Sequence, residues 1–259
     1  MALVCALLAA PPAAADCGYR QADERAALDR VLDGDTLVLG DGRHLRLIGV
    51  NTPELARRGR AAEPLAREAR DFSRRFLAGG DLHILYDRDR RDRHGRTLGH
   101  VYNHRGESLE AALLSAGLAF HIAIAPNLTL AECLAQREAS ARRRGRGIWA
   151  PGVWPVKRAA DVQPGDGGFV LLRGTVREVD RNRYLWLELD GPVALRLPLA
   201  EGSQPGDSGQ LSRRDWQGAQ IEVKGWLVDR GAKYTSRFPQ HKRFFISIDS
   251  EYSLEFSRN

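Results

Sequence analysis

The sequence is poor in cysteine, in lysine and in long apolar runs. No apolar run reaches the roughly 18 residues that a membrane-spanning helix needs, so stable insertion into a membrane is not expected. The three cysteines form no Cys-x-x-Cys pair, and the histidines lack a zinc-ligand spacing to them, which argues against a zinc module. Glycine-rich phosphate loops of the Walker or dinucleotide type are also missing, which argues against a nucleotide-dependent enzyme.

The overall composition is that of a globular protein. The chain has 259 residues, of which 43% are hydrophobic and 28% charged, and it is long enough for two modest domains. Only four of its 39 basic residues are lysines, and its net charge is +6. The arginine excess has two explanations: codon usage in a GC-rich genome, or the bidentate fit of guanidinium to phosphate. A nucleic-acid partner is therefore permitted but not required.

The N-terminus resembles a secretory signal peptide. Residues 1–15 hold an apolar run that ends in three alanines, although the charged residues that usually begin a signal are missing. A buried N-terminal segment is the alternative. Cleavage after Ala15 would leave Cys17 and Cys133 in an oxidising compartment. The sequence therefore predicts one disulfide between them and a periplasmic or secreted protein.

Residues 27–150 have the pattern of an α+β domain. Strand-like alternation predicts a hairpin with its turn at residues 40–42. On its second strand Leu45 and Leu47 share one face, so Arg46 faces the opposite side.

Three helices are expected in the same domain. Apolar residues at steps of three and four predict the first from Pro64 to about Ala78. Ser108 is placed to cap a second helix. Thr129 and Glu132 have the spacing of a capping box for a third. With the strands between these helices, the order indicates a small barrel.

The second half of the chain has a different sequence pattern. Residues 151–168 are rich in proline and glycine and are typical of a linker. Residues 169–257 hold about five short strand-like runs with little helix between them, which predicts a second small all-β barrel of the oligonucleotide-binding (OB) type. Trp216 and Trp226 lie near basic residues there, but core packing explains such tryptophans more often than base stacking does. The sequence does not specify what this domain binds.

Oxygen-bearing residues gather in and after the predicted hairpin. A hard cation such as Ca²⁺ binds several oxygens, including at least one carboxylate. Asp35, Asn51 and the carbonyl of Thr52 could supply them if neighbouring strands bring positions 35 and 51 together. Glu54, beside such a metal rather than on it, could orient or deprotonate a water.

Two arginines could serve the same chemistry. Phosphodiester cleavage builds negative charge on the oxygens at phosphorus, and guanidinium is well shaped to meet it. Arg46 qualifies by its direction, and Arg96 lies at the end of a turn made by Gly95. Taken singly, each residue is weak evidence, because loop arginines and glutamates are usually solvated.

Taken together, the segments "VLDGDT", "LRLIGVNTPE", "DRHGR" and "ARRRGRGIW" resemble the staphylococcal nuclease (thermonuclease) family over about residues 27–150. The resemblance implies a five-stranded OB-type barrel with three helices. It also implies a Ca²⁺-dependent endonuclease that acts on single-stranded DNA and RNA and leaves 3′-phosphate ends. By position, it assigns the metal to Asp35, Asn51 and the carbonyl of Thr52, the general base to Glu54, and phosphate binding to Arg46 and Arg96.

The chain departs from the family's pattern in two places. Asn51 stands where the best-known member has an aspartate, which removes one negative charge and predicts weaker, but not lost, Ca²⁺ binding. Ala123 and Ala125 replace tyrosines near the nucleotide, so base stacking there should be poorer. Phe120 or His121 could substitute for them, although a histidine among apolar residues is more often packed.

Two interpretations stay open at this point. The preferred one is a nuclease with an accessory barrel that grips the strand or presents the enzyme to a partner. The alternative is a nucleic-acid or protein binding module on a nuclease scaffold, without turnover. Retention of Asp35, Glu54 and both arginines favours the enzyme, while the choice between DNA and RNA is left open.

Overall fold

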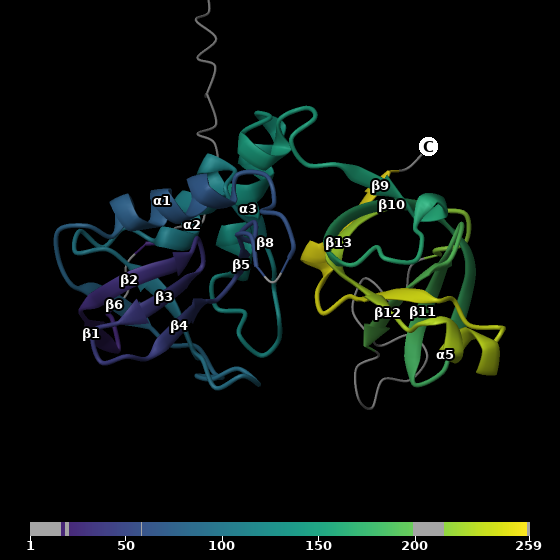
Figure 1. The fold of residues 1–259 in the computed structure, drawn as a ribbon, viewed down its shortest axis with the longest axis horizontal. Helices are drawn as coiled ribbons and strands as arrows, with labels where there is room; N and C mark the ends of the chain where they lie inside the picture. The colour runs from purple at the N-terminus through teal and green to yellow at the C-terminus, as the bar shows by residue number, and fades with distance from the viewer. Residues whose placement is uncertain (1–16, 19–20, 58, 199–214, 258–259) are drawn as a thin grey trace, which may run out of the picture.

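The computed structural model describes residues 17–18, 21–57, 59–198 and 215–257, which form two domains side by side (Figure 1). The expected signal segment, residues 1–15, lies outside the described residues. Within the described ranges, no helix is long and apolar enough to cross a membrane.

The first domain is built on a sheet in the order β1-β6-β7-β4-β3-β2. Only Ala27 separates β1 from β2, so the two act as one bent strand that closes the sheet into a five-stranded barrel. This confirms the predicted OB-type barrel. The strands are β1 (Glu24–Ala26), β2 (Leu28–Asp33), β3 (Thr36–Leu39), β4 (His44–Leu47), β5 (Val50–Asn51), β6 (Leu82–Leu85), β7 (Thr97–Tyr102) and β8 (Phe120–His121).

The predicted hairpin is formed by β3 and β4. Gly42 in its turn has a φ of 86°, a conformation that glycine adopts without steric cost. Leu45 and Leu47 are buried in the core, as their alternation requires. Arg46 lies on the other face, opposite Thr36 of β3.

Three helices accompany the first barrel: α1 (Ala66–Phe76), α2 (Leu109–Ala116) and α3 (Ala131–Arg143). Ser108 caps α2 as predicted, because its hydroxyl accepts the backbone N–H of Ala111 at 3.1 Å. Gly117 ends α2 with a φ of 69°, where a Cβ would lie 2.2 Å from the carbonyl oxygen of Arg146. Only glycine fits this close approach.

The predicted capping box at α3 is wrong. Leu130 stands at the N-cap, and no side chain caps the helix there. Thr129 instead donates its backbone N–H and its hydroxyl to Asp87, at 3.0 and 2.9 Å. Two hydrogen bonds to a carboxylate outweigh one cap, and the partner lies 42 residues away in sequence.

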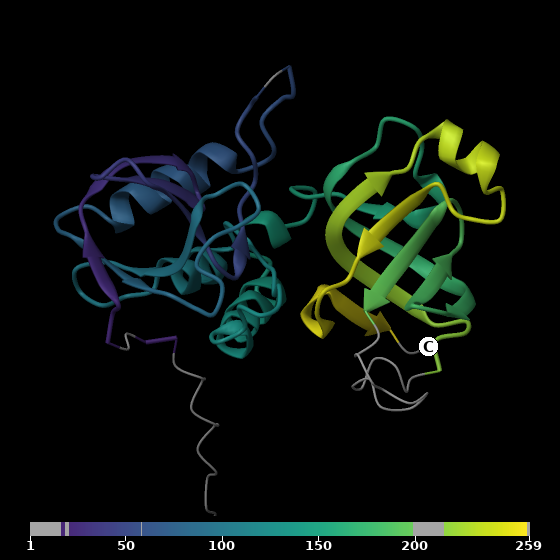
Figure 2. The same ribbon diagram turned by 90° about the horizontal axis from the view of Figure 1, so that it is seen from below.

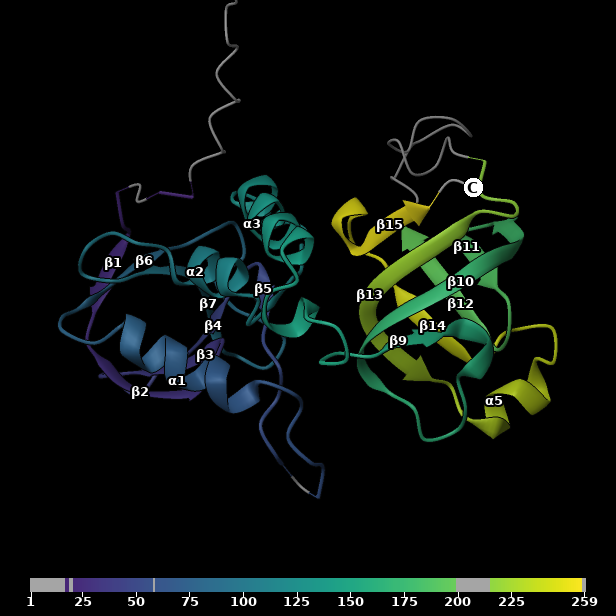
Figure 3. The same ribbon diagram turned by 90° about the horizontal axis from the view of Figure 1, so that it is seen from above.

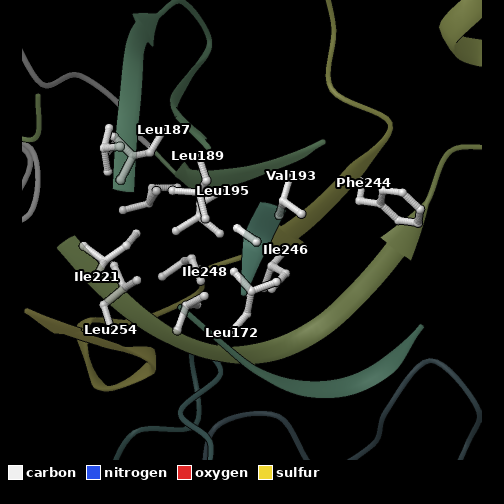
Figure 4. Packing of buried hydrophobic residues seen from close by; sticks show 14 of the residues in the cluster. Leu172, Leu187, Leu189, Val193, Leu195, Ile221, Phe244, Ile246, Ile248 and Leu254 are labelled. Carbon is white, nitrogen blue, oxygen red and sulfur yellow. The ribbon is translucent and has the colours of Figure 1, made fainter. Parts of the chain in front are cut away.

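The second domain is a closed five-stranded barrel in the order β10-β11-β12-β14-β13, with β13 paired back to β10 (Figure 3). In both barrels the third and fifth strands run parallel and their other neighbours antiparallel, so the two share one strand plan. Leucine, isoleucine and valine side chains fill this barrel (Figure 4). The elements are β9 (Val156–Arg158), β10 (Gly168–Arg181), β11 (Tyr184–Leu189), β12 (Val193–Pro198), β13 (Gln220–Asp229), α5 (Ala232–Arg237), β14 (Phe244–Ser247) and β15 (Leu254–Ser257).

Residues 151–168, predicted as a linker, are partly built into this second barrel. β9 runs parallel to β10 and adds to its sheet. Ala159 and Val162 belong to the barrel core. A strand of three residues among prolines and glycines has too few positions to show a period of two, so the pattern concealed it.

The two domains pack against each other through α3 and β13. In Figure 2 and Figure 3, α3 lies on the side of the first domain that faces the second barrel. Glu138 on α3 forms a buried ion pair with Lys224 on β13. Arg142, one turn further along α3, pairs with Glu222 and Glu255. Buried charges that satisfy one another fix the relative position of their elements, because separating them would leave each unpaired.

An aromatic cluster lies beside these ion pairs. The ring of Phe120, at the end of the first barrel, has its centroid 4.9 Å from those of both Trp154 and Phe169. Phe169 in turn packs edge-on against Trp226 at 5.1 Å. Apolar contact of this kind makes the two domains one packed unit rather than two beads on a linker.

A disulfide joins Cys17 to Cys133 on α3, with their Cα atoms 5.6 Å apart. The two residues are the pair that the sequence predicts. The bridge ties the start of the described chain to a helix 116 residues later and closes most of the first domain into a loop.

Candidate active site

Three polar side chains from separate segments converge on the outside of the first barrel. Asp35 lies in the turn from β2 to β3, Arg46 on β4 and Asn51 at the end of β5. Nη1 of Arg46 is 2.9 Å from Oδ2 of Asp35, and Nη2 of Arg46 donates to Oδ1 of Asn51 at 3.1 Å. The pairing of β3 with β4, which sets Thr36 opposite Arg46, brings positions 35 and 46 together.

Asp35 also organises the segment that follows β5. Its Oδ2 accepts the backbone N–H of Thr52 at 2.8 Å, and its Oδ1 accepts the hydroxyl of Thr36 at 3.0 Å. Asp35 and Thr52 are 3% and 1% exposed. The carboxylate therefore fixes the backbone N–H of Thr52, the residue whose carbonyl is the predicted ligand.

Asp33 is a member of this cluster that the sequence analysis did not select. It is buried, pairs with Arg57, and has one carboxylate oxygen with no partner among the described residues. Burial raises its pKa above the ordinary value, and the charge of Asp35 adds to this, while Arg57 opposes it. Its position two residues before Asp35, at the end of a strand, was the available signal.

Glu54 lies in the loop after β5, at the exposed rim of the cluster. Its backbone N–H donates to the carboxylate of Glu63 at 2.8 Å, and its carbonyl accepts the N–H of Glu63 at 2.9 Å, so the loop holds it from both sides. Burial raises the pKa of Glu54, and the negative charges of Asp35 and Asp33 raise it further. A carboxylate whose proton affinity is raised in this way is a stronger base than a free glutamate.

Arg96 lies apart from this cluster but borders the same cleft. Its Nε is 2.6 Å from Oδ2 of Asp92, across the turn that carries Gly95. Arg46 and Arg96 both line a cleft of about 670 Å³ on the surface of the molecule. The structure thus brings both predicted arginines to one cavity, with Asp35 and Asn51 in contact with Arg46.

Comparison with known proteins shows which family the chain belongs to. Residues 44–151 match the staphylococcal nuclease homologue family. The chain is 35% identical over 124 residues to the thermonuclease of Staphylococcus hyicus, which covers 47% of this chain and 73% of the relative. The chain belongs to the staphylococcal nuclease family. It is a nuclease.

Other relatives also match a part of the nuclease. The thermonuclease of Staphylococcus intermedius is 32% identical over 123 residues, covering 46% of this chain and 73% of the relative. Endonuclease YncB of Bacillus subtilis (strain 168) is 36% identical over 96 residues, covering 36% of this chain and 45% of the relative. The family match ends at residue 151, before the second barrel.

The site of the nuclease offers oxygen ligands to a cation. No group of three or more histidine, cysteine, aspartate or glutamate side chains suited to a metal occurs in the described part of the chain. The set at hand is instead one carboxylate, one amide and one peptide carbonyl, from Asp35, Asn51 and Thr52. Asp33 and Thr52 each add a buried side-chain oxygen with no partner among the described residues. Oxygen donors of this mixture suit a hard cation, so the residues present fit Ca²⁺.

Phe120 and His121 do not replace the missing tyrosines at the nucleotide. Both are fully buried where the two domains meet. The ring of His121 lies edge-on to Tyr252 of the second domain, at 5.2 Å between centroids. Burial lowers the pKa of His121 to about 3, and the charge of Lys224 contributes. A buried ring cannot stack on a base, so of the two alternatives that the sequence left open, packing is the one observed.

Proposed function

We propose that the nuclease uses Ca²⁺ to hydrolyse phosphodiester bonds of DNA or RNA, with a preference for single strands, and leaves 3′-phosphate ends. The observation that carries the proposal is the convergence of Asp35, Arg46 and Asn51, with Glu54 held at their rim. Family membership supports turnover rather than binding alone.

In this proposal, Asp35, Asn51 and the carbonyl of Thr52 hold the metal. A bound Ca²⁺ would polarise a phosphate oxygen and lower the barrier to attack at phosphorus. Asp33 lies close enough to Asp35 for the charge of Asp35 to help raise the pKa of Asp33. Its unpartnered oxygen supports a role in holding the water around the ion.

Glu54 serves as the general base. It takes a proton from the attacking water as the water oxygen bonds to phosphorus, and the bond from phosphorus to the 5′ oxygen breaks. The strand is left with a 3′-phosphate on one fragment and a 5′-hydroxyl on the other. Burial and the neighbouring carboxylates raise the pKa of Glu54, which favours this proton transfer.

Arg46 and Arg96 stabilise the charge that builds on the phosphoryl oxygens. Arg46 is held by hydrogen bonds to Asn51 and to the carbonyl of Leu47, and Arg96 by Asp92. Guanidinium groups fixed before the reaction lower the barrier because they need no reorganisation when the charge appears.

Digestion of denatured DNA and of RNA, with Ca²⁺ and with a chelator, tests this proposal. Cleavage should require Ca²⁺, should be faster on denatured than on duplex DNA, and should give fragments that a 3′-phosphatase modifies. Cleavage that persists in chelator, or fragments with 3′-hydroxyl ends, would contradict it.

We also propose a periplasmic or secreted location. The disulfide between Cys17 and Cys133 supports it, because structural disulfides persist in oxidising compartments. Fractionation of cells that express the full chain, with the nuclease detected by antibody, would decide between these places and the cytoplasm.

A further inference from the structure

The cleft at the active site does not end at the first domain. One part of its lining comes from Arg46, Arg96 and the loop around Ile124, and another from Arg196, Trp226 and Phe245 of the second barrel. β13, which carries Trp226, lies on the side of that barrel that faces the first domain (Figure 1, Figure 3). The two domains therefore line one continuous cleft.

The outer surface of the second barrel carries a row of arginines and aromatic rings that begins in the cleft, at Arg196 and Phe245, and continues past it. Alternate residues of a strand face opposite sides, and the inward ones fill the barrel core. The strand register puts Trp186 of β11 opposite Arg196 of β12, and Arg196 opposite Ser247 of β14. We name this surface the arginine–aromatic face; its residues are Tyr184, Trp186, Arg196, Arg230 and Phe245.

The two arginines of the face are held by rings rather than by acids. The guanidinium of Arg196 lies 5.0 Å from the ring of Tyr184 and 5.3 Å from that of Phe245. That of Arg230 lies 4.7 Å from Phe245 and 5.0 Å from Trp186. Among the residues that the structure describes, neither arginine forms an ion pair with a carboxylate. Within the described ranges, two cations thus lie side by side and neither has an ion-paired carboxylate.

Two acids on the same side of the barrel form no ion pair with these arginines. Asp249 lines the cleft and feels the charge of Arg196, but burial raises its pKa and it makes no ion pair with that arginine. Glu188, on the same outer side of β11, lies instead 3.6 Å from Lys242. Burial lowers the pKa of Arg230, and the charge of Arg196 lowers it further, as expected for two cations that lie close together.

Exposed apolar side chains connect the face to the active site. Ile124, Trp226 and Val228 are 47%, 42% and 43% exposed, and all three line the cleft. Large apolar side chains left open beside unpaired arginines fit a ligand that has both flat rings and negative charges. Bases stack on aromatic rings while arginines meet the phosphates between them, whereas an acidic peptide would leave the rings without partners.

We propose that the nuclease holds its substrate over both domains, with nucleotides next to the cut bond lying along the cleft and further ones on the arginine–aromatic face. This rests on the proposed function, because the strand is the one cleaved at Arg46 and Arg96. The second barrel then selects long single strands over short ones. The ion pairs and rings between the domains keep the two halves of the path in line.

Substrate length tests this directly. The probes are a dinucleotide with a fluorogenic leaving group, which reaches only the active site, and a single-stranded DNA of about 15 nucleotides. The variant is Arg196→Ala with Arg230→Ala, and a second variant replaces both by Lys, which keeps charge and loses much of the stacking. Arg158→Ala removes an exposed arginine of the same barrel that does not line the cleft, and serves as the control.

The Ala pair should raise KM for the long strand roughly tenfold to a hundredfold, because it removes two cations that would meet phosphates and two guanidinium planes on which bases would stack. It should leave kcat and KM for the dinucleotide unchanged. Binding of the long strand, measured by fluorescence anisotropy in chelator, should weaken by the same factor and depend less on salt. For the Lys pair, KM for the long strand should lie between the values of wild type and the Ala pair. For Arg158→Ala it should equal that of wild type.

The inference would be overturned if wild type and the Ala pair had equal KM on the long strand. It would also be overturned if the Ala pair raised KM by the same factor on both probes. The first result would also be expected if the face served an acidic protein instead. Failure of the proposed function looks different: wild type would then cleave neither probe, while anisotropy would still report whether the face binds the strand.

Discussion

The two barrels have the same strand plan and opposite charge arrangements on their outer surfaces. In the first, Asp33 and Asp35 gather at a strand end, and Arg46 and Arg57 balance them. In the second, Arg196 and Arg230 rest on aromatic rings with no carboxylate pair among the described residues. The same strand order therefore carries a candidate cation site in the first barrel and a candidate phosphate path in the second. The side chains on the strands, and not the barrel itself, determine the chemistry.

Removing one arginine from each barrel should show the largest difference between the barrels, because the two changes affect different kinetic constants. Arg46→Ala is expected to lower kcat by about 10²–10³-fold, as loss of one fixed donor to a developing oxyanion does. Arg230→Ala should leave kcat unchanged and raise KM for long strands. Steady-state kinetics on a long oligonucleotide gives both values, and a larger fall of kcat with Arg230→Ala than with Arg46→Ala would reverse the assignment.

Disulfide removal should affect the first domain more than the second. Cys133→Ser opens a loop of 116 residues and should reduce the free energy of unfolding by about 2–4 kcal/mol. Urea titration followed by circular dichroism should show an early transition for the first domain and a later one for the second barrel. Reduced wild type is the matched control. Unchanged unfolding midpoints would contradict a structural role for the bridge.

Acid should loosen the contact between the barrels. The pKa of His121 is lowered to about 3 in the folded protein from an ordinary value of 6.5. The unfolded chain therefore binds the proton more readily, so this part of the stability is present above pH 6.5 and is lost as the pH falls toward 3. The loss is at most about 1.4 kcal/mol per pH unit for one proton.

Urea midpoints across this pH range measure that slope. His121→Phe, which keeps a ring but cannot take up a proton, should flatten it. His44→Phe, at an exposed position on β4, should not. Equal slopes for both variants would show that His121 does not link acid to stability.

Asn51→Asp should give the smallest effect. A second carboxylate beside Asp35 adds one negative charge to the oxygen ligands, and hard-cation affinity follows that charge. The Ca²⁺ concentration for half-maximal cleavage should fall a few-fold, with kcat little changed. A calcium titration of activity measures this, and an unchanged or higher requirement would argue against position 51 as a ligand.

Local sequence patterns predicted much of the first barrel. The alternation around Arg46 gave its direction, and the serine at position 108 gave the start of α2. Asp35, Arg46 and Asn51 were found because they lie in or close to one recognisable hairpin. Such features depend on residues within a few positions of each other, so the sequence displays them.

Features that depend on distant partners were not visible. Thr129 binds Asp87 rather than its own helix, and His121 is buried by residues of the second domain. Asp33 was missed because its partner Arg57 comes from a loop without regular pattern. The arginine–aromatic face combines alternate positions of three strands, which only the register of the closed barrel brings together.

Single-turnover cleavage by the Glu54→Gln variant tests the central claim most directly. The exchange keeps size and shape but removes the group that would accept a proton from water, and it should slow cleavage of a single-stranded oligonucleotide by about 10²–10⁴-fold in Ca²⁺. Affinity for the oligonucleotide should stay as in wild type. Glu68→Gln, at an exposed position on α1, should cleave normally. Cleavage by Glu54→Gln at the wild-type rate would contradict the account.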